Sequence, residues 1–380
     1  MGENPEMRVV VVSNFAWSLT TFRGDLIKQM VAGGHDVHVV APDFENDPEL
    51  GDKLRNWSVT PHTIAMSRAG LTPIQDLKLL FGLYCLFREV RADHVFGYTS
   101  KPVIFGTLAG RLAGVSKRFV MINGLGYAFT GKPKGKRRFV RWLLIVLYWI
   151  ALKNADGVFF QNPDDSEDLR RLRVLGPRTR TILVNGSGVN TSDYPQQPIP
   201  SGPISFLLIA RLIADKGIRE YLAAARAIGR KFPDVRFHLV GDYDPNPSAI
   251  TPDEIKKWSQ LGNICFHGHL NNVRDVLKNC SVYVLPSYYR EGTPRSILEA
   301  LSTGRPVITT DAPGCRETVQ DGINGFLIPA RDAAALAAAM ENFIDNPALV
   351  VSMGQKSREM ALNKYDVKKV NAVMLDAMDL

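Results

Sequence analysis

The sequence predicts an α/β protein built from two Rossmann-like domains that face each other across a cleft. A strand–helix rhythm runs through most of the 380 residues, and its strand positions are continuous apolar runs, as in buried parallel sheets. One segment rich in Gly, Ser, Pro and Asn interrupts the rhythm. We therefore expect an N-terminal domain at 1–185, a linker at 186–203, a C-terminal domain at 204–365, and a helix at 366–380 that packs back on the first domain.

Each domain supplies a series of strands with helices between them. The first strand, RVVVVS at 8–13, is followed by a helix expected at 22–32. The other elements of the first domain are expected as strands at 35–41, 94–96, 118–123 and 157–161, and as helices at 73–89, 102–112, 137–151 and 163–172. Those of the second domain are expected as strands at 204–210, 236–240, 264–267, 282–285, 306–310 and 325–328, and as helices at 217–231, 252–261, 273–279, 294–302, 316–321 and 333–345. Such sheets bind ligands at the carboxyl ends of their strands, so we expect the site there.

The composition is that of a soluble globular protein, with 45% hydrophobic and 22% charged residues. The four cysteines include no CxxC pair, which argues against a zinc site or a disulfide framework and favours a reducing compartment. The histidines show no metal-binding spacing: His267 and His269 would share one face of a strand, without an evident third ligand. The polar N-terminus predicts no signal peptide, and the apolar run at 142–152 is too short to span a membrane.

Positive charge is concentrated in the first domain, although the whole chain carries a net charge of only +8. The stretch 94–155 contains no Asp or Glu. Its densest part is a basic run ahead of an apolar helix with Trp142 and Trp149, and we expect this run to contact an anionic membrane surface: Lys132, Lys134, Lys136, Arg137, Arg138 and Arg141. The alternative is a core helix preceded by a solvated loop, and we expect a mixture of the two. Nucleic acid is not expected, because no binding module accompanies the charge.

The segment 285–301 combines a strand end, a helix start and two carboxylates. Pro294 favours a helix start, with Thr293 as a plausible N-cap, and the amides of Arg295 and Ser296 would then point toward a diphosphate or a sugar hydroxyl. Glu291 and Glu299 would lie on either side, each able to accept hydrogen bonds from a diol. The alternative is that Glu299 forms an i,i+4 pair with Arg295 on a solvated helix face.

Two cations follow the first strand of the second domain. Arg211 and Lys216 would lie on its strand-to-helix loop, where they can neutralise a nucleotide diphosphate and its charge as it leaves. The alternative is two solvated surface cations. Asp242-Tyr243-Asp244 reads as the DxD of metal-dependent transferases, but short carboxylate pairs recur by chance, so we expect no metal there.

These segments resemble the retaining GT-B glycosyltransferases of family GT4. The matching elements occur in the family's order: Arg211-Leu212, Lys216-Gly217, Val240-Gly241-Asp242, Phe266-His267-Gly268, Pro286-Ser287, Glu291-Gly292, Glu299-Ala300 and Asn324-Gly325-Phe326. The first domain resembles a subgroup that acts on sugars linked to a polyprenyl diphosphate. Its markers are Tyr98-Thr99-Ser100-Lys101-Pro102, Asn123-Gly124-Leu125-Gly126-Tyr127, Phe160-Gln161-Asn162 and Ser187-Gly188-Val189-Asn190.

The resemblance implies roles for residues of the second domain. Arg211 and Lys216 would bind the donor diphosphate, Glu299 the nucleotide ribose and Glu291 the transferred sugar. The remaining donor-binding residues would be Gly268 and His269 near the base, Asp242, and the helix start at Gly292, Thr293, Arg295 and Ser296. The resemblance further implies retention of anomeric configuration with a UDP-sugar as co-substrate and neither metal nor cofactor.

The first domain is expected to hold the acceptor. We assign to its acceptor side Phe15, Trp17, Tyr98, Lys101, Gly124, Gly126 and Tyr127, and count Asn123 with the catalytic set. Many family members carry a His where this chain has Asn123 or Tyr98, so no general base is assigned. Gly124-x-Gly126 lacks the third glycine of a dinucleotide fingerprint, which argues against a dehydrogenase.

The sequence thus predicts a transferase at the inner, cytoplasmic face of the cell membrane. It would move a hexose or N-acetylhexosamine from a UDP-sugar to a lipid-linked saccharide. Two alternatives stay open at this point, a sugar-nucleotide epimerase on the same architecture and a non-catalytic sugar-nucleotide-binding protein.

Overall fold

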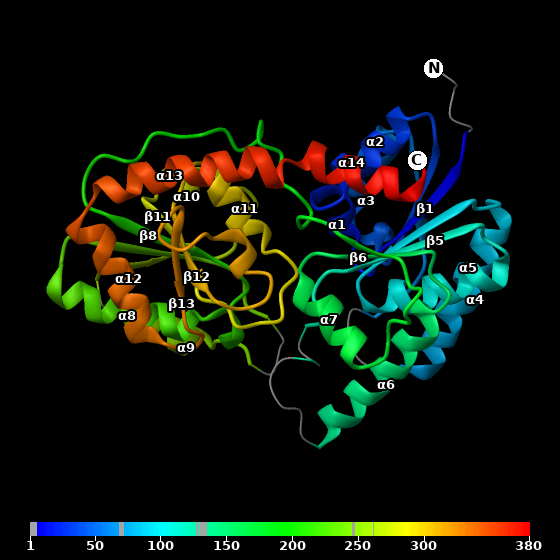
Figure 1. Ribbon diagram of the computed structural model, residues 1–380, viewed down its shortest axis with the longest axis horizontal. Helices are drawn as coiled ribbons and strands as arrows, with labels where there is room; N and C mark the ends of the chain where they lie inside the picture. The colour runs from blue at the N-terminus through cyan, green and yellow to red at the C-terminus, as the bar shows by residue number, and fades with distance from the viewer. Residues whose placement is uncertain (1–5, 68–71, 127–128, 130–134, 245–247, 261) are drawn as a thin grey trace. The chain divides into compact units, whose positions relative to one another are not determined.

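The structure, a computed structural model, describes residues 6–67, 72–126, 129, 135–244, 248–260 and 262–380. Contacts divide the chain into two compact units, 1–187 with 368–380 and 188–367. Each unit is one twisted sheet flanked by helices (Figure 1), and every strand pair in both sheets is parallel. The predicted α/β class with two parallel sheets is confirmed.

The sheet of the first unit has the order β3-β2-β1-β4-β5-β6-β7, so the order reverses between β1 and β4. Its strands are β1 (Arg8–Val12), β2 (Asp36–Ala41), β3 (Val59–Thr63), β4 (His94–Tyr98), β5 (Lys117–Ile122), β6 (Gly157–Phe160) and β7 (Thr181–Leu183). The strands β3 and β7 were not predicted. Both lie at sheet edges and carry polar or exposed side chains, so neither shows the continuous apolar run of a central strand.

The helices of the first unit agree with the predicted positions, with two additions. They are α1 (Ala16–Thr21), α2 (Gly24–Ala32), α3 (Pro48–Arg55), α4 (Pro73–Glu89), α5 (Thr107–Ala113), α6 (Lys136–Leu152) and α7 (Pro163–Arg171), with a 3-10 turn η1 (Phe44–Asn46) and a π-helix η2 (Pro102–Gly106). The helices α1 and α3 were not predicted, and the helix expected at 102–112 begins as η2. Asp47 and Asn162 cap α3 and α7 by accepting from backbone N–H groups.

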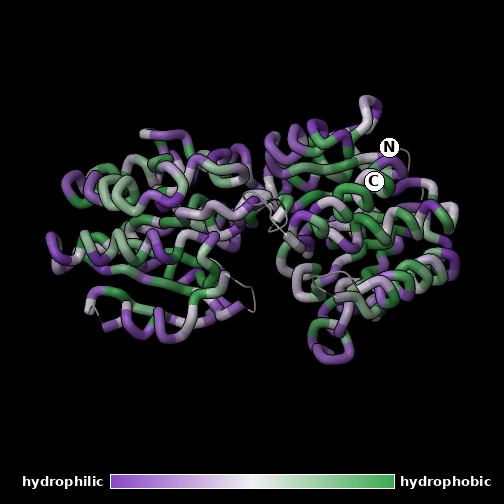
Figure 2. The backbone as a smooth tube through the Cα atoms, turned by 90° about the horizontal axis from the view of Figure 1, so that it is seen from below, coloured by the Kyte–Doolittle hydropathy of each residue, from purple (hydrophilic) through white to green (hydrophobic). Residues whose placement is uncertain are grey.

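The sheet of the second unit has the order β10-β9-β8-β11-β12-β13, with its reversal between β8 and β11. Its strands are β8 (Ser205–Ile209), β9 (Arg236–Val240), β10 (Ile264–Phe266), β11 (Val282–Leu285), β12 (Val307–Thr310) and β13 (Gly325–Ile328). All six match predicted strands to within one or two residues. Hydrophobic segments run through the interior of each unit, as the green stretches of Figure 2 show.

The helices of the second unit also follow the predicted order. They are α8 (Ile218–Lys231), α9 (Pro252–Ser259), α10 (Arg274–Lys278), α11 (Arg295–Ser302), α12 (Ala333–Asp345) and α13 (Ala348–Met360), with short 3-10 turns η4 (Ala214–Lys216) and η5 (Arg316–Thr318) and a π-helix η6 (Ala361–Tyr365). Helix α9 begins with a full capping box between Thr251 and Glu254. The helix expected at 316–321 is only the single turn η5.

The two segments that pass between the units are well anchored. Within the expected linker, Tyr194 accepts a hydrogen bond from Ser302 Oγ at 2.6 Å, and Pro198 accepts one from Arg305 at 2.9 Å. The last helix, α14 (Val367–Met378), buries Val370 and Met374 in the core of the first unit. Among the described residues, no helix combines the length and the apolar character needed to cross a membrane.

Candidate functional site

The catalytic candidates of the second unit lie where its sheet reverses its strand order. Arg211 follows β8 and Ser287 follows β11, and these two strands pair directly. Loops at the carboxyl ends of such neighbouring strands diverge to opposite faces of a sheet and leave a crevice for a ligand. The fold therefore brings two segments together that are far apart in the sequence.

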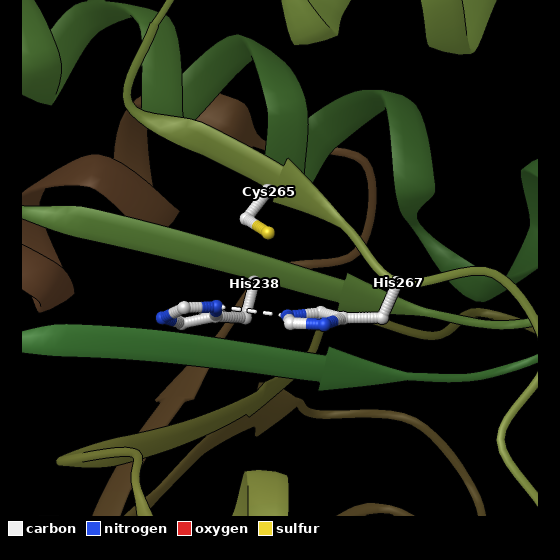
Figure 3. A group of neighbouring side chains, drawn as sticks. All are labelled: His238, Cys265 and His267. Atoms are coloured by element: carbon white, nitrogen blue, oxygen red, sulfur yellow. Dashed lines mark hydrogen bonds between the residues drawn. The ribbon is translucent and has the colours of Figure 1, made fainter.

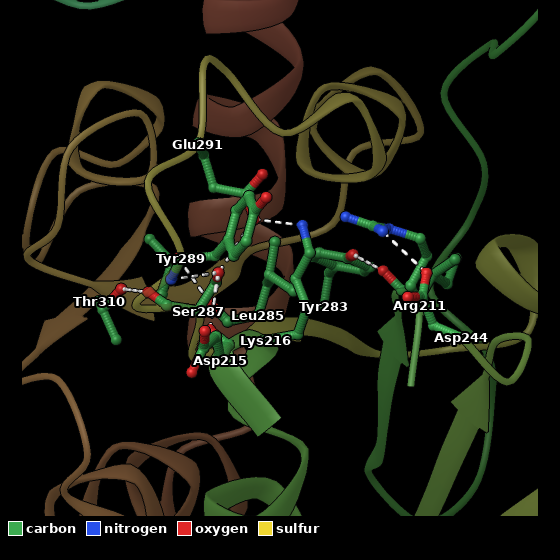
Figure 4. A network of polar contacts seen from close by, with 12 residues as sticks. Arg211, Asp215, Lys216, Asp244, Tyr283, Leu285, Ser287, Tyr289, Glu291 and Thr310 are labelled. Atoms are coloured by element: carbon green, nitrogen blue, oxygen red, sulfur yellow. Dashed lines mark hydrogen bonds and ion pairs between the residues drawn. The ribbon is translucent and has the colours of Figure 1, made fainter. Parts of the chain in front are cut away.

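A mostly buried ion pair lies at this edge of the sheet. Lys216 Nζ contacts Glu291 Oε1, and each side chain is only 12% exposed. Ser287 Oγ donates to the same carboxylate oxygen at 3.0 Å. Figure 4 shows these three residues together with the ring of Tyr289, which lies 5.5 Å from Lys216 Nζ. These contacts fix the position of the Lys216 ammonium group and remove part of its water. The partial loss of water strengthens its attraction for an anion.

Backbone contacts fix the loop that carries Glu291. The carbonyl of Asp215, beside Lys216, accepts hydrogen bonds from the N–H groups of Tyr288 and Tyr289, both at 2.9 Å. Gly217 has a positive φ of 76°, and a Cβ there would come within 2.1 Å of the Pro286 carbonyl oxygen. Glycine is therefore required for η4 and the Pro286 turn to approach so closely.

Arg211 is held beside this cluster by a carboxylate. Its Nη1 lies 2.8 Å from Asp244 Oδ2, and its guanidinium carbon lies 6.0 Å from the Tyr289 ring (Figure 4). Asp244 is the second acid of the DxD pattern, so the structure gives it an arginine partner. Asp242, the first acid, is two-thirds exposed and accepts from the Tyr243 N–H at 2.8 Å.

Glu299 lies on α11 and has a partner on the same helix. Arg295 Nε donates to Glu299 Oε1 at 3.0 Å. The i,i+4 pair considered as an alternative thus exists, but it is mostly buried, with side-chain exposures of 20% for Arg295 and 11% for Glu299. Burial raises the pKa of Glu299, although Arg295 and Tyr194 act to lower it.

The raised pKa of Glu299 gives a testable pH dependence. The folded protein keeps this proton to a higher pH than the unfolded chain does, so the free energy of unfolding decreases as the pH rises from 4.5 through the raised value. We expect Glu299→Gln to remove this contribution. Denaturant unfolding of both proteins, from about pH 4 to about pH 8, measures the difference in slope. Equal slopes would show that Glu299 is not the responsible group.

The start of α11 is more enclosed than the sequence suggested. The helix begins at Arg295, with Pro294 rather than Thr293 at the capping position, and Thr293 is 8% exposed. In the sheet, the Tyr283 hydroxyl of β11 donates to the Ile209 carbonyl of β8 at 3.1 Å, which ties these two strands together.

Gly292 lies against Gly314, which has a φ of 82°. A Cβ on Gly314 would come within 1.7 Å of the Gly292 carbonyl oxygen. Gly314 was not singled out in the sequence. In the sequence, Gly314 appears only as part of a Pro-Gly pair after a strand. Such a pair predicts a turn, but it does not show which residues the turn contacts.

Gly268 and His269 follow β10, as predicted for a loop near the nucleotide base. Gly268 has a positive φ of 68°, and its carbonyl accepts from the Gly241 N–H at 2.9 Å. His269 is exposed and hydrogen-bonds to Asn271 at 3.0 Å. The expectation that His267 and His269 share a strand face is wrong, because β10 ends at Phe266 and Gly268 turns the chain.

Residues at the carboxyl edge of the first sheet form a hydrogen-bonded group. Tyr98 is fully buried, and its hydroxyl lies 2.8 Å from Ser18 Oγ, which donates to the Phe15 carbonyl at 2.6 Å. Phe15 and Trp17 have ring centroids 5.8 Å apart, and Trp17 is 48% exposed. Of this aromatic set, Trp17 is the residue most open to a ligand.

Asn123 is held by two long polar side chains. Its Oδ1 accepts from Arg23 at 3.3 Å and from Gln161 at 3.4 Å. Arg23 is 2% exposed and lies 5.3 Å from the Tyr98 ring. The sequence analysis missed Arg23, because one arginine at a helix start carries no signal of burial. Arg23 thus places a positive charge next to Asn123, which was predicted to belong to the catalytic set.

The other acceptor-side candidates differ in their surroundings. Lys101 is 7% exposed, and its ammonium contacts Asp76 and donates to Ser67 and Thr72. These contacts use all three donors of a lysine, so Lys101 anchors the start of α4. Gly124 and Gly126 have positive φ values of 99° and 68°. Tyr127 lies outside the described residues.

Comparisons with known proteins show which families the chain resembles. Residues 19–186 match the family model of the glycosyl transferase 4-like domain, and residues 190–360 match that of glycosyl transferases group 1. The chain is 27% identical over 374 residues to N,N'-diacetylbacillosaminyl-diphospho-undecaprenol alpha-1,3-N-acetylgalactosaminyltransferase of Campylobacter jejuni, covering 95% of each chain. It is 28% identical over 311 residues to UDP-Gal:alpha-D-GlcNAc-diphosphoundecaprenol alpha-1,3-galactosyltransferase of Escherichia coli, covering 78% of this chain and 77% of that one.

Solved structures share the fold of this chain. Sucrose-phosphate synthase of Thermosynechococcus elongatus superposes with a TM-score of 0.82 at 18% identity, covering 98% of both chains. HepE of Anabaena, in complex with UDP-glucose, superposes with a TM-score of 0.76 at 17% identity, covering 99% of this chain and all of the other. At such identities the likeness concerns the fold.

Proposed function

Because the chain belongs to the GT-B glycosyltransferases of family GT4, we propose that it moves a hexose or N-acetylhexosamine from a UDP-sugar to a saccharide linked to a polyprenyl diphosphate. The epimerase alternative finds no support in the comparisons. Membership of the family establishes glycosyl transfer, and the donor, the acceptor and the stereochemistry are proposed.

The proposed donor site rests on one observation. Lys216 is held beside Glu291, with Arg211 nearby, at the point where the strand order of the second sheet reverses. A diphosphate would bind against both cations. Arg211 would donate two parallel hydrogen bonds from its guanidinium group, and Lys216 would supply a compact positive charge. Glu291 would accept a hydrogen bond from a sugar hydroxyl, and Glu299 from the ribose diol. Such pre-aimed charges stabilise the negative charge that develops on the leaving diphosphate.

Retention and metal independence form part of the same proposal. Arg211 and Lys216 would supply the positive charge that a divalent ion supplies elsewhere. As the bond from the anomeric carbon to the diphosphate oxygen breaks, the acceptor oxygen bonds to the same face of the sugar. The acceptor proton passes to the departing diphosphate oxygen. This route keeps the anomeric configuration and needs no side chain as general base, which fits Asn123 in place of a histidine.

The acceptor class is inferred from the relatives. The Campylobacter jejuni and Escherichia coli proteins are named for sugars linked through a diphosphate to undecaprenol, and the first of them covers nearly the whole of this chain. The Escherichia coli protein is named for UDP-galactose, and HepE was solved with UDP-glucose, which favours uridine in the donor. We infer the same pairing of substrates here.

The test is a panel of UDP- and GDP-sugars with a synthetic polyprenyl-diphosphate sugar, in the presence of a chelator. We expect transfer from one UDP-sugar, and NMR of the product should show the anomeric configuration of the donor. Dependence on added metal or an inverted linkage would contradict the mechanism. UDP binding without turnover on any acceptor would instead favour a non-catalytic binding protein.

We also propose that the first unit contacts the anionic inner face of the cell membrane. Helix α6 buries Tyr148 and Leu152 in the core but leaves Phe139 61% and Trp142 57% exposed. Arg138 is exposed beside them. Lys132 and Lys134 lie outside the described residues, as do the side chains of Lys136 and Arg137. The helix was expected to be mostly core, with only the basic loop at the lipid; instead, α6 also leaves large apolar side chains exposed.

A second helix of the first unit also exposes apolar side chains. Helix α4 exposes Ile74, Leu77 and Phe81 at a spacing that places them on one helix face. The π-helix η2 contacts both α4 and α6, so the two helices flank it. Exposed aromatic and aliphatic side chains next to basic ones are typical of interfacial membrane contacts. They would bring the enzyme to a lipid-linked acceptor.

Replacing both Phe139 and Trp142 by Ser should weaken binding to vesicles that contain anionic lipid by about tenfold or more, because each large side chain buries apolar area in the interface. Vesicle co-sedimentation measures this loss. Val351→Ser is the matched control, since Val351 is 59% exposed on α13 of the second unit. Equal binding by both variants would refute the membrane surface.

A further inference from the structure

Three side chains that ligate metals meet on two neighbouring strands of the second unit. His238 lies on β9, Cys265 on β10, and His267 directly after β10. Cys265 pairs in register with His238, and alternate residues of an extended chain share a face. The three side chains therefore project from the same side of the sheet, as Figure 3 shows.

Their ligand atoms are already close to one another. His238 Nδ1 and His267 Nε2 are 3.0 Å apart, and the ligand atoms of all three residues lie within 4.8 Å of one another. In a tetrahedral zinc site, bond lengths of about 2.0–2.3 Å place neighbouring ligand atoms about 3.3–3.6 Å apart. Small side-chain rotations would bring the group to that geometry. Cys265 is exposed to solvent, so water can serve as a fourth ligand.

We propose that His238, Cys265 and His267 form a binding site for a borderline-soft divalent cation of the Zn²⁺ class. Two imidazoles and a thiolate select such ions over Mg²⁺ and Ca²⁺, which prefer oxygen ligands. On binding, the Cys265 thiol releases its proton to solvent. The ring that donates the hydrogen bond between His238 and His267 moves its proton to its other nitrogen, so that both rings face the metal with an unprotonated nitrogen. This inference does not depend on the proposed transferase function.

The first unit contains an internal comparison for this site. His38 Nδ1 and His62 Nε2 are also 3.0 Å apart, and the rings of both pairs have centroids 5.2 Å apart. His38 has Asp36 as its other neighbour, at 3.2 Å, instead of a thiol. Two histidines in this arrangement can thus be a simple hydrogen-bonded pair. The third ligand, Cys265 Sγ, distinguishes the proposed site from the His38–His62 pair.

Cobalt binding tests the proposal, because a thiolate bound to Co²⁺ gives an intense near-ultraviolet charge-transfer band. Protein kept reduced without chelating agents is titrated with Co²⁺ and then with Zn²⁺, and calorimetry gives the zinc affinity. We expect one equivalent of Co²⁺ to produce the band and Zn²⁺ to abolish it. Cys265→Ser should lose the band, and both Cys265→Ser and His267→Ala should bind zinc at least about tenfold more weakly.

Two control variants make the result decisive. Cys85 is the other exposed free cysteine among the described residues, and Cys85→Ser should keep both the band and the affinity. His62→Ala removes the comparison pair and should do the same. No band in the wild type, a band that persists in Cys265→Ser, or a band lost in Cys85→Ser would each overturn the proposal. Circular dichroism confirms that each variant is folded.

Discussion

Lys216→Ala is expected to lower kcat/KM for sugar transfer by about 100- to 1000-fold, the usual effect of removing one group that stabilises developing negative charge. The Lys216 ammonium lies against Glu291 and Tyr289 and is mostly buried. Replacing an exposed lysine would lower kcat/KM only a little, because water screens its charge. Here the lost charge would face the diphosphate in a partly desolvated site, so the effect should fall on kcat as well as on KM.

The matched control is Lys231→Ala. Lys231 lies at the end of α8, where it pairs with Glu341 at 2.7 Å and is well exposed. We expect its kcat/KM to stay within about twofold of the wild type, as for most surface pairs. Steady-state kinetics and UDP calorimetry on both variants measure the difference, with thermal unfolding as a check of the fold. Near-normal turnover by folded Lys216→Ala would reject the proposed phosphate contact.

Gly314→Ala should reduce transfer by about 100-fold, although Gly314 is assigned no contact with substrate. A Cβ would meet the Gly292 carbonyl oxygen at 1.7 Å and the Glu291 carbonyl oxygen at 2.8 Å, so the backbone of this loop must move. A misplacement of about 1 Å in a positioned group can cost about 100-fold in rate. The left-handed φ adds a destabilisation of about 1–2 kcal/mol.

Gly322→Ala separates the two contributions. Gly322 has a similar φ of 72°, but no atom lies within 4 Å of its added Cβ. It should therefore lose stability, measured by denaturant unfolding, by about 1–2 kcal/mol while transfer stays normal. If Gly314→Ala also transferred sugar at the wild-type rate, the position of the Glu291–Gly292 loop would not matter for the reaction.

The fold was predictable because parallel strands leave a strong signal. Strands such as β1 and β8 are buried on both faces and read as unbroken apolar runs. The edge strands β3 and β7 lack this signal, since β3 contains Pro61 and β7 leaves Leu183 56% exposed. The sequence therefore revealed the central strands of both sheets and missed the two edges of the first.

The site was predictable only in part. The loop positions of Lys216 and Glu291 follow from strand ends, but their contact across 75 residues depends on the pairing of β8 with β11. The His238–Cys265–His267 cluster was missed for a similar reason. Spacing along one strand pointed to His267 and His269, whereas the ligand atoms meet across two strands. The register between neighbouring strands depends on the fold, and it could not be predicted from this one sequence.

The most direct test of the central claim is a structure of the protein with UDP bound. We predict that the diphosphate lies within hydrogen-bond distance of Lys216 and Arg211, and that the ribose hydroxyls contact Glu299. A nucleotide bound away from these three residues would contradict the assignment of the donor site.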